Sequence, residues 1–144
     1  MEEFGMNKVY YYYNCNPHCR ITADCVIRAI SSATGDGWEQ TLKELTEYSV
    51  KTGYMINTPE CYGRYLKDKG FVKQKQPKLP NGKKMRFKEF VKKFDGHAIA
   101  HCGRGHVNYV ADNSVWDIWD TSDEVIGNYW VHNTELKLIK KVGE

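Results

Sequence analysis

The first part of the chain carries apolar residues at helical spacing. Ile27, Ile30 and Ala33 recur three residues apart, which predicts a buried helix over residues 25–33. Gly35 follows directly, and a glycine just beyond the last turn is a common helix end. The first long element of the chain is therefore expected to be a core helix.

Three more helices are predicted, over residues 38–50, 58–69 and 86–94. The third helix of the chain has the clearest ends, because Thr58 is a suitable N-cap, Pro59 takes the first helical position and Gly70 follows the last turn. Residues 73–84 hold two prolines and a glycine, which predicts a connector.

The later part of the chain changes to an alternating pattern that is typical of strands. Strands are predicted at residues 10–14, 97–102, 106–111 and 114–119, with two more at 129–131 and 135–141. Short turns, at residues 103–105 and 112–113, separate the middle three strands. Helices followed by strands predict an α+β fold in which the N-terminal helices pack on a C-terminal antiparallel sheet. The length of 144 residues favours a single domain over residues 1–144.

Composition and charge exclude several classes of protein. With 41% hydrophobic and 27% charged residues, the chain is not expected to be disordered. It has no apolar run of the ~20 residues that a membrane helix needs, and the start Met1-Glu2-Glu3-Phe4 lacks the features of a signal peptide. A net charge of +3 is too small to indicate nucleic-acid binding. We therefore expect a cytoplasmic protein without a nucleic-acid or membrane partner.

The five cysteines cannot all pair within the chain, and without an export signal we expect free thiols. Cys15-x-x-His18-Cys19 has spacing compatible with zinc ligands, and His101-Cys102 forms a distant second pair. Adjacent residues on a strand point to opposite faces, however, and no Cys-x-x-Cys pair is repeated. No metal or cofactor is predicted, and a zinc-stabilised interaction domain remains an alternative.

Cys25 lies at the predicted start of the first helix. Asp24 is a suitable N-cap, which leaves Cys25 at the first helical position. The free N–H groups and the positive end of the helix dipole favour a thiolate there. Such a thiolate is the nucleophile of cysteine acyl-transfer chemistry, and the backbone N–H of Cys25 is a candidate oxyanion donor.

His106 opens a predicted strand directly after Gly103-Arg104-Gly105, and the next strand carries Asp117 and Asp120. Two antiparallel neighbours bring the end of one strand beside the start of the other, so His106 is expected near Asp120, or near Asp117 in a different register. Side chains three residues apart on a strand point to opposite faces of the sheet, so only one of the two carboxylates can face His106. That carboxylate would orient the imidazole.

The order of these parts resembles the papain-like cysteine peptidase superfamily. More narrowly, Thr22-Ala23-Asp24-Cys25-Val26-Ile27-Arg28-Ala29-Ile30, Val115-Trp116-Asp117-Ile118-Trp119-Asp120 and Tyr129-Trp130 resemble small papain-like proteins of phage and prophage genomes. That group has a Gly-Asp-Cys-x-x-Arg-Ala-Ile helix start, a His strand and a Tyr-Asp-x-Trp-Asp strand. The resemblance covers roughly residues 10–131.

The resemblance implies a role for each matching residue. Cys25 corresponds to the nucleophile, His106 to the base and Asp120 to the orienting residue, with Asp117 as the second choice. Larger papain relatives place an oxyanion-donating glutamine six positions before the cysteine, where this chain has Cys19. Asn14 and Asn16 are the alternative side-chain donors, and Asn16 is preferred.

The sequence therefore predicts a cysteine-dependent acyl-transfer enzyme, a peptidase, isopeptidase or amidase with the triad Cys25, His106 and Asp120. Its expected partner is a protein or peptide substrate. The alternative is a papain-like module of weak or no activity that binds and blocks a host or partner protein, which the missing glutamine suggests. If the chain is phage-encoded, the expected location is the host cytoplasm.

Overall fold

The computed structural model describes residues 8–143, so Met1-Glu2-Glu3-Phe4 lies outside the described part of the chain. Four α-helices, six strands and a C-terminal 3-10 helix follow in the order β1 (Tyr10–Tyr12), α1 (Cys25–Thr34), α2 (Trp38–Thr52), α3 (Pro59–Asp68), β2 (Phe71–Gln74), α4 (Phe87–Lys93), β3 (Ala98–Cys102), β4 (His106–Ala111), β5 (Ser114–Asp117), β6 (Ile126–His132) and η1 (Asn133–Lys141). The fold is α+β, as the sequence predicts.

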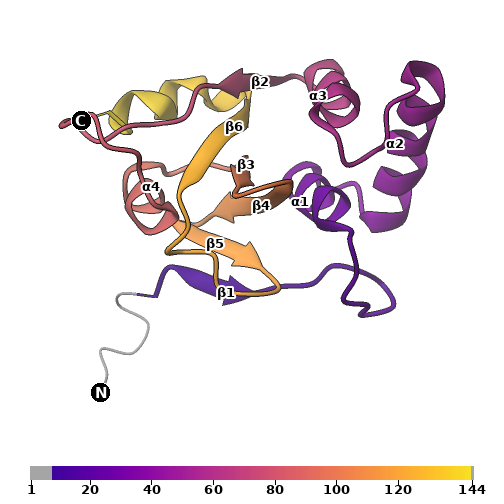
Figure 1. Cartoon of the computed structure of the whole chain (residues 1–144), viewed down its shortest axis with the longest axis horizontal. Helices are drawn as coiled ribbons and strands as arrows, with labels where there is room; N and C mark the ends of the chain where they lie inside the picture. The colour runs from indigo at the N-terminus through magenta and orange to yellow at the C-terminus, as the bar shows by residue number, and fades with distance from the viewer. Residues whose placement is uncertain (1–7, 144) are drawn as a thin grey trace.

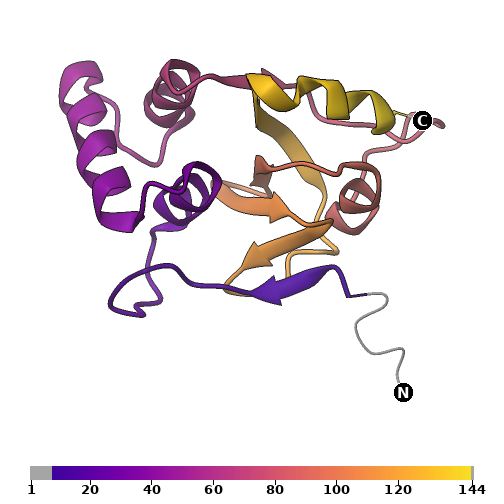
Figure 2. The ribbon, with the colours of Figure 1, turned by 180° about the vertical axis from the view of Figure 1, so that it is seen from behind.

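All six strands form one sheet in the order β1-β5-β4-β3-β6-β2. Figures 1 and 2 show α1, α2 and α3 gathered at one side of this sheet, with α4 and η1 at the other. Side chains alternate between the two sides, as strand geometry requires. Ile99 packs with Ile27 and Ile30 of α1, whereas the neighbouring Ala98 and Ala100 pack with α4. The sheet thus separates two hydrophobic cores.

The sheet differs from the predicted one in its two edges. It is mixed, not antiparallel, because β1 runs parallel to β5, with Tyr11 opposite Trp116. At the other edge, β2 pairs antiparallel with β6 and begins before the residues predicted as a connector. Both edges join segments that are far apart in the sequence, and a local hydrophobic pattern carries no information about such pairings.

The predicted strand at residues 135–141 is wrong, because this segment forms η1. Its apolar residues do not alternate between two faces. Leu138 and Ile139 pack against the core on the α4 side, and Val142, three residues after Ile139, is buried in that core. A three-residue spacing suits the three residues per turn of a 3-10 helix.

The predicted helices are confirmed to within a few residues. α1 ends as expected at Gly35, which adopts the left-handed conformation with φ 77° and donates its N–H to the Ser31 carbonyl. Pro59 is the first residue of α3. Within residues 8–143, every helix is too short or too polar to cross a lipid bilayer.

Candidate active site

Cys25 is the first residue of α1, as predicted, but Asp24 does not cap the helix with its side chain. The Asp24 carboxylate accepts hydrogen bonds from Arg28 Nε at 2.8 Å and Trp38 Nε1 at 2.9 Å. Asn16 Nδ2 donates to the same carboxylate at 3.1 Å. Because these partners occupy the carboxylate, the first turn of α1 keeps free N–H groups beside Cys25.

His106 begins β4 directly after a turn in which Gly103 and Gly105 both have positive φ. Its Nε2 lies 2.7 Å from Asp117 Oδ2. The Cys25 side chain lies close enough to the ring for each group to shift the pKa of the other, while its Sγ donates to the Gly105 carbonyl oxygen at 3.9 Å. Since Nε2 is occupied by Asp117, Nδ1 is the ring nitrogen left for the sulfur. The side chains of Cys25, His106 and Asp117 therefore lie together where α1 and β4 begin and β5 ends.

The carboxylate that contacts His106 is that of Asp117, so the expected position of Asp120 beside the ring is wrong. β4 and β5 pair with Tyr109 opposite Trp116, which places Asn108 opposite Asp117. Side chains two residues apart on a strand share a face, so His106 and Asp117 face the same way. Asp120 lies beyond the end of β5, where it accepts the Ser122 N–H at 2.9 Å.

Asp117 is held firmly in a buried position. Its side chain is 1% exposed, and Oδ1 accepts from Arg28 Nη1 at 3.2 Å and from the Ile118 N–H at 2.8 Å. With Oδ1 occupied in this way, Oδ2 is the oxygen that remains for His106. The carboxylate can neither rotate nor tilt without breaking a hydrogen bond.

Arg28 joins Asp117 to Asp24 and is a member of the candidate site that the sequence did not predict. It lies on α1, three residues after Cys25, and its side chain is only 8% exposed. An arginine between the buried apolar residues Ile27 and Ala29 is the signal that could have identified it, because a buried charge needs a partner. It fixes the nucleophile helix to β5.

The charges of the site favour a thiolate–imidazolium pair. Burial by itself raises the pKa of the Cys25 thiol, but hydrogen bonds from His106 and the Val107 backbone, with the positive charges of His106 and Arg28, lower it overall. Burial likewise acts to lower the pKa of His106, yet the hydrogen bonds and negative charges of Asp117 and Cys25 raise it to about 9. Both shifts favour placing the shared proton on His106.

The side-chain amide of Asn16 is engaged by neighbouring groups of the chain. Asn16 is 5% exposed; its Nδ2 donates to Asp24, and its Oδ1 accepts the His18 N–H at 2.8 Å. These contacts stabilise the loop before α1. The backbone N–H of Cys25 remains the candidate oxyanion donor at the start of the helix.

Trp119 covers His106 on its outer side. The two ring centroids are 4.2 Å apart, and Trp119 is itself 48% exposed. A half-exposed indole against the imidazole shields the His106–Asp117 hydrogen bond from water. A shielded hydrogen bond is electrostatically stronger than an exposed one.

The cysteines and histidines considered as zinc ligands do not come together. Cys15 Sγ lies 3.1 Å from Ser31 Oγ, Cys19 is exposed, and Cys102 is buried in the core on the α4 side of the sheet. Within residues 8–143, no group of three His, Cys, Asp or Glu side chains is arranged to hold a metal ion. All five cysteines are free thiols.

Comparisons with protein-family models, with curated proteins and with solved structures find no match for this chain. The interpretation of the site therefore depends on its own geometry and charges.

Proposed function

We propose that this chain is a cysteine-dependent acyl-transfer enzyme that acts on a peptide, isopeptide or amide bond. One observation supports the proposal above all others. Cys25 lies beside His106, where each group shifts the pKa of the other, and His106 Nε2 lies 2.7 Å from the buried carboxylate of Asp117. This arrangement activates a nucleophile and holds its base in one orientation.

Each group has a defined task in the proposed reaction. The Cys25 thiolate attacks the substrate carbonyl, and the Cys25 backbone N–H stabilises the resulting oxyanion. The bond between the carbonyl carbon and the amine then breaks, and protonated His106 gives its proton to the leaving amine. The acyl group stays on sulfur until water, or a second amine or thiol, attacks it while His106 accepts a proton.

Asp117 and Arg28 are positioning residues in this scheme. Asp117 keeps the His106 ring turned so that Nδ1 faces the sulfur, and it stabilises the imidazolium. Arg28 keeps Asp117 in place from the nucleophile helix. The site thus places a protonated His106 against the Asp117 carboxylate in a largely buried environment.

Selective alkylation tests the proposal. At pH 6, iodoacetamide should label Cys25 far faster than the other four cysteines, as measured by mass spectrometry of proteolytic fragments. The rapid phase should vanish in Cys25→Ala and persist in Cys19→Ala, which removes an exposed cysteine six positions earlier. Equal labelling of Cys25→Ala and the parent protein would falsify the proposal.

A second candidate is a papain-like binding module of weak or no activity that blocks a partner protein. The observation that favours it is the oxyanion site, where Cys19 is exposed and Asn16 is bound to Asp24. A pull-down with the parent and Cys25→Ala proteins separates the two candidates. A biological effect that survives in Cys25→Ala favours binding, whereas an effect that depends on Cys25 favours catalysis.

A further inference from the structure

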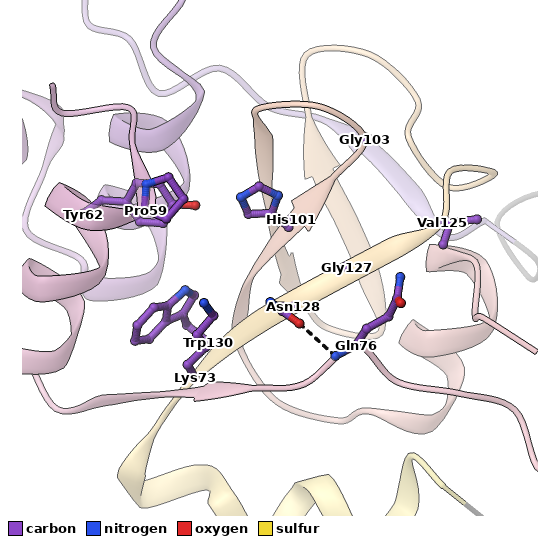
Figure 3. A pocket seen from close by; sticks show the side chains of 10 residues that line it. All are labelled: Pro59, Tyr62, Lys73, Gln76, His101, Gly103, Val125, Gly127, Asn128 and Trp130. Atoms are coloured by element: carbon purple, nitrogen blue, oxygen red, sulfur yellow. Dashed lines mark hydrogen bonds between the residues drawn. The ribbon is translucent and has the colours of Figure 1, made fainter. Parts of the chain in front are cut away.

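A cavity of about 490 Å³ lies between α3 and the face of the sheet that carries β2, β3 and β6. Figure 3 shows its lining side chains arranged around one hollow. Two aromatic rings and four polar side chains form most of the wall: Tyr62, Trp130, Lys73, His101, Gln76 and Asn128. A volume of this size holds a side chain and the adjoining backbone of a peptide.

The cavity adjoins the candidate nucleophile. Gly103 lines it, and Gly105, two residues further along the same turn, has its carbonyl oxygen 3.9 Å from Cys25 Sγ. Tyr62, which is 2% exposed, belongs to the wall as well, and burial followed by the nearby charge of Cys25 raises its pKa. Cys25 does not itself line the cavity, so a substrate that fills the cavity would reach the Cys25 sulfur by passing the turn of residues 103–105.

The polar groups of the cavity favour an anion. None of its lining residues is an aspartate or glutamate, whereas Lys73 places an ammonium group 6.0 Å from the centroid of the Trp130 ring. Glu60 and Glu124 lie near the rim without lining the cavity. Burial, followed by the charges of Lys73 and His106, lowers the pKa of His101. His101 is then a neutral hydrogen-bonding group beside a single cation.

Asn128 adds a donor whose orientation is fixed. Its Oδ1 accepts the backbone N–H of Gln76 at 3.0 Å, so Nδ2 is the end left for a ligand (Figure 3). An ammonium and an amide N–H at one end, with an indole and a phenol as walls, suit a carboxylate on an aliphatic stem.

We propose that this cavity binds an aspartate or glutamate side chain of the substrate, next to the amide bond that Cys25 attacks. Lys73 and Asn128 hold the carboxylate, while Tyr62 and Trp130 contact the aliphatic stem. This inference rests on the proposed acyl-transfer function and gives it a substrate class, namely acidic peptides.

Electrophilic tripeptides test the inference. One series carries a chloromethyl ketone at its C-terminal end and the other a chloroacetyl group at its N-terminal end, each with Glu, Gln or Lys beside the electrophile. For each protein, the rate at which a peptide alkylates Cys25 is divided by the rate at which iodoacetamide alkylates Cys25. In one of the two series, the Glu peptide should react about tenfold faster than the Lys peptide, because attraction to Lys73 is replaced by repulsion.

Two charge-reversal variants distinguish binding in the cavity from an effect of the protein's net charge. Lys73→Glu should abolish or reverse the preference for Glu, and Lys73→Gln should reduce it. Lys75→Glu makes the same change of net charge at an exposed neighbour outside the cavity and should preserve the preference. A missing Glu preference in both series, or one that persists in Lys73→Glu, overturns the inference. If iodoacetamide itself does not label Cys25 selectively, the proposed function fails instead.

Discussion

Replacing Asp117 by asparagine probes the geometry of the site with almost no change of shape. In the parent protein, Oδ1 accepts from Arg28 Nη1 and the Ile118 N–H, and Oδ2 faces His106 Nε2. The same two donors should hold the amide oxygen of the new asparagine on their side. The amide NH₂ then faces Nε2, which must become an acceptor.

This change reverses the tautomer of the base. If Nε2 accepts, the single proton of the neutral ring lies on Nδ1 and points at the Cys25 sulfur. His106 in this state cannot take a proton from the thiol. The substitution should therefore impair the base through its protonation pattern while the backbone stays in place.

The size of the effect follows from the pKa of His106, which is raised from 6.5 to about 9. At about 1.4 kcal/mol for each pKa unit, this corresponds to about 3 kcal/mol in favour of the imidazolium. Asp117 and Cys25 share that stabilisation, and the hydrogen bond with Asp117 is the largest contribution that raises the pKa. The alkylation rate of Cys25 at pH 6 should then fall by about tenfold or more.

The assay is the rate of Cys25 alkylation by iodoacetamide between pH 5 and 9, with thermal unfolding recorded for each variant. Asp120→Asn removes the same charge three residues later and should keep the parent profile within about twofold, as surface charges contribute little. A parent-like profile in Asp117→Asn, or a larger loss in Asp120→Asn, would refute the assignment of Asp117.

Three other predictions test the charges and the packing. His106→Ala leaves burial to raise the Cys25 thiol pKa without the imidazole that chiefly opposes it. Alkylation at pH 6 should then slow by about tenfold or more, and the difference should narrow toward pH 9; parallel pH profiles would contradict this. Arg28→Met leaves two buried carboxylates without their cation. The free energy of unfolding, measured by urea titration, should fall by about 3–5 kcal/mol. A change below ~1 kcal/mol would show that Asp24 and Asp117 do not need Arg28 to compensate their charge. Leu45 is 0% exposed, so Leu45→Ala should lower the free energy of unfolding by about 2–5 kcal/mol. Leu136 is 37% exposed, so Leu136→Ala should lower it by less than ~1 kcal/mol. Equal losses in the two variants would argue against the packing around α2.

Local patterns predicted the elements that carry the nucleophile and the base. Cys25 at the start of α1 and His106 at the start of β4 follow from an apolar helical stripe and from a glycine turn. Both signals span fewer than about a dozen residues, within which backbone preferences and hydrophobic period operate. The α+β order of the elements was predictable for the same reason, because each element has its own local pattern.

Contacts between distant residues account for the errors of the sequence prediction. Asp24 is a normal N-cap residue by type, yet its carboxylate is bound by Asn16 and Trp38, eight and 14 residues away in the sequence, as well as by Arg28 in the next turn of α1. The contact with Asp24 also engages the Asn16 amide. Hydrogen bonds of this kind depend on how α1, α2 and the preceding loop pack, which no local pattern describes.

The amino-acid sequence by itself determined most of the helices and strands, although not β2 or η1, and it placed a cysteine and a histidine where two of the elements begin. Only the tertiary structure decided which groups meet. The pairing of Tyr109 with Trp116 turned Asp117 toward His106, and the packing of α1 brought Arg28 to Asp117 across 89 residues of sequence. Helix and strand preferences are properties of neighbouring residues, whereas strand register and buried ion pairs are settled by the free energy of the whole core.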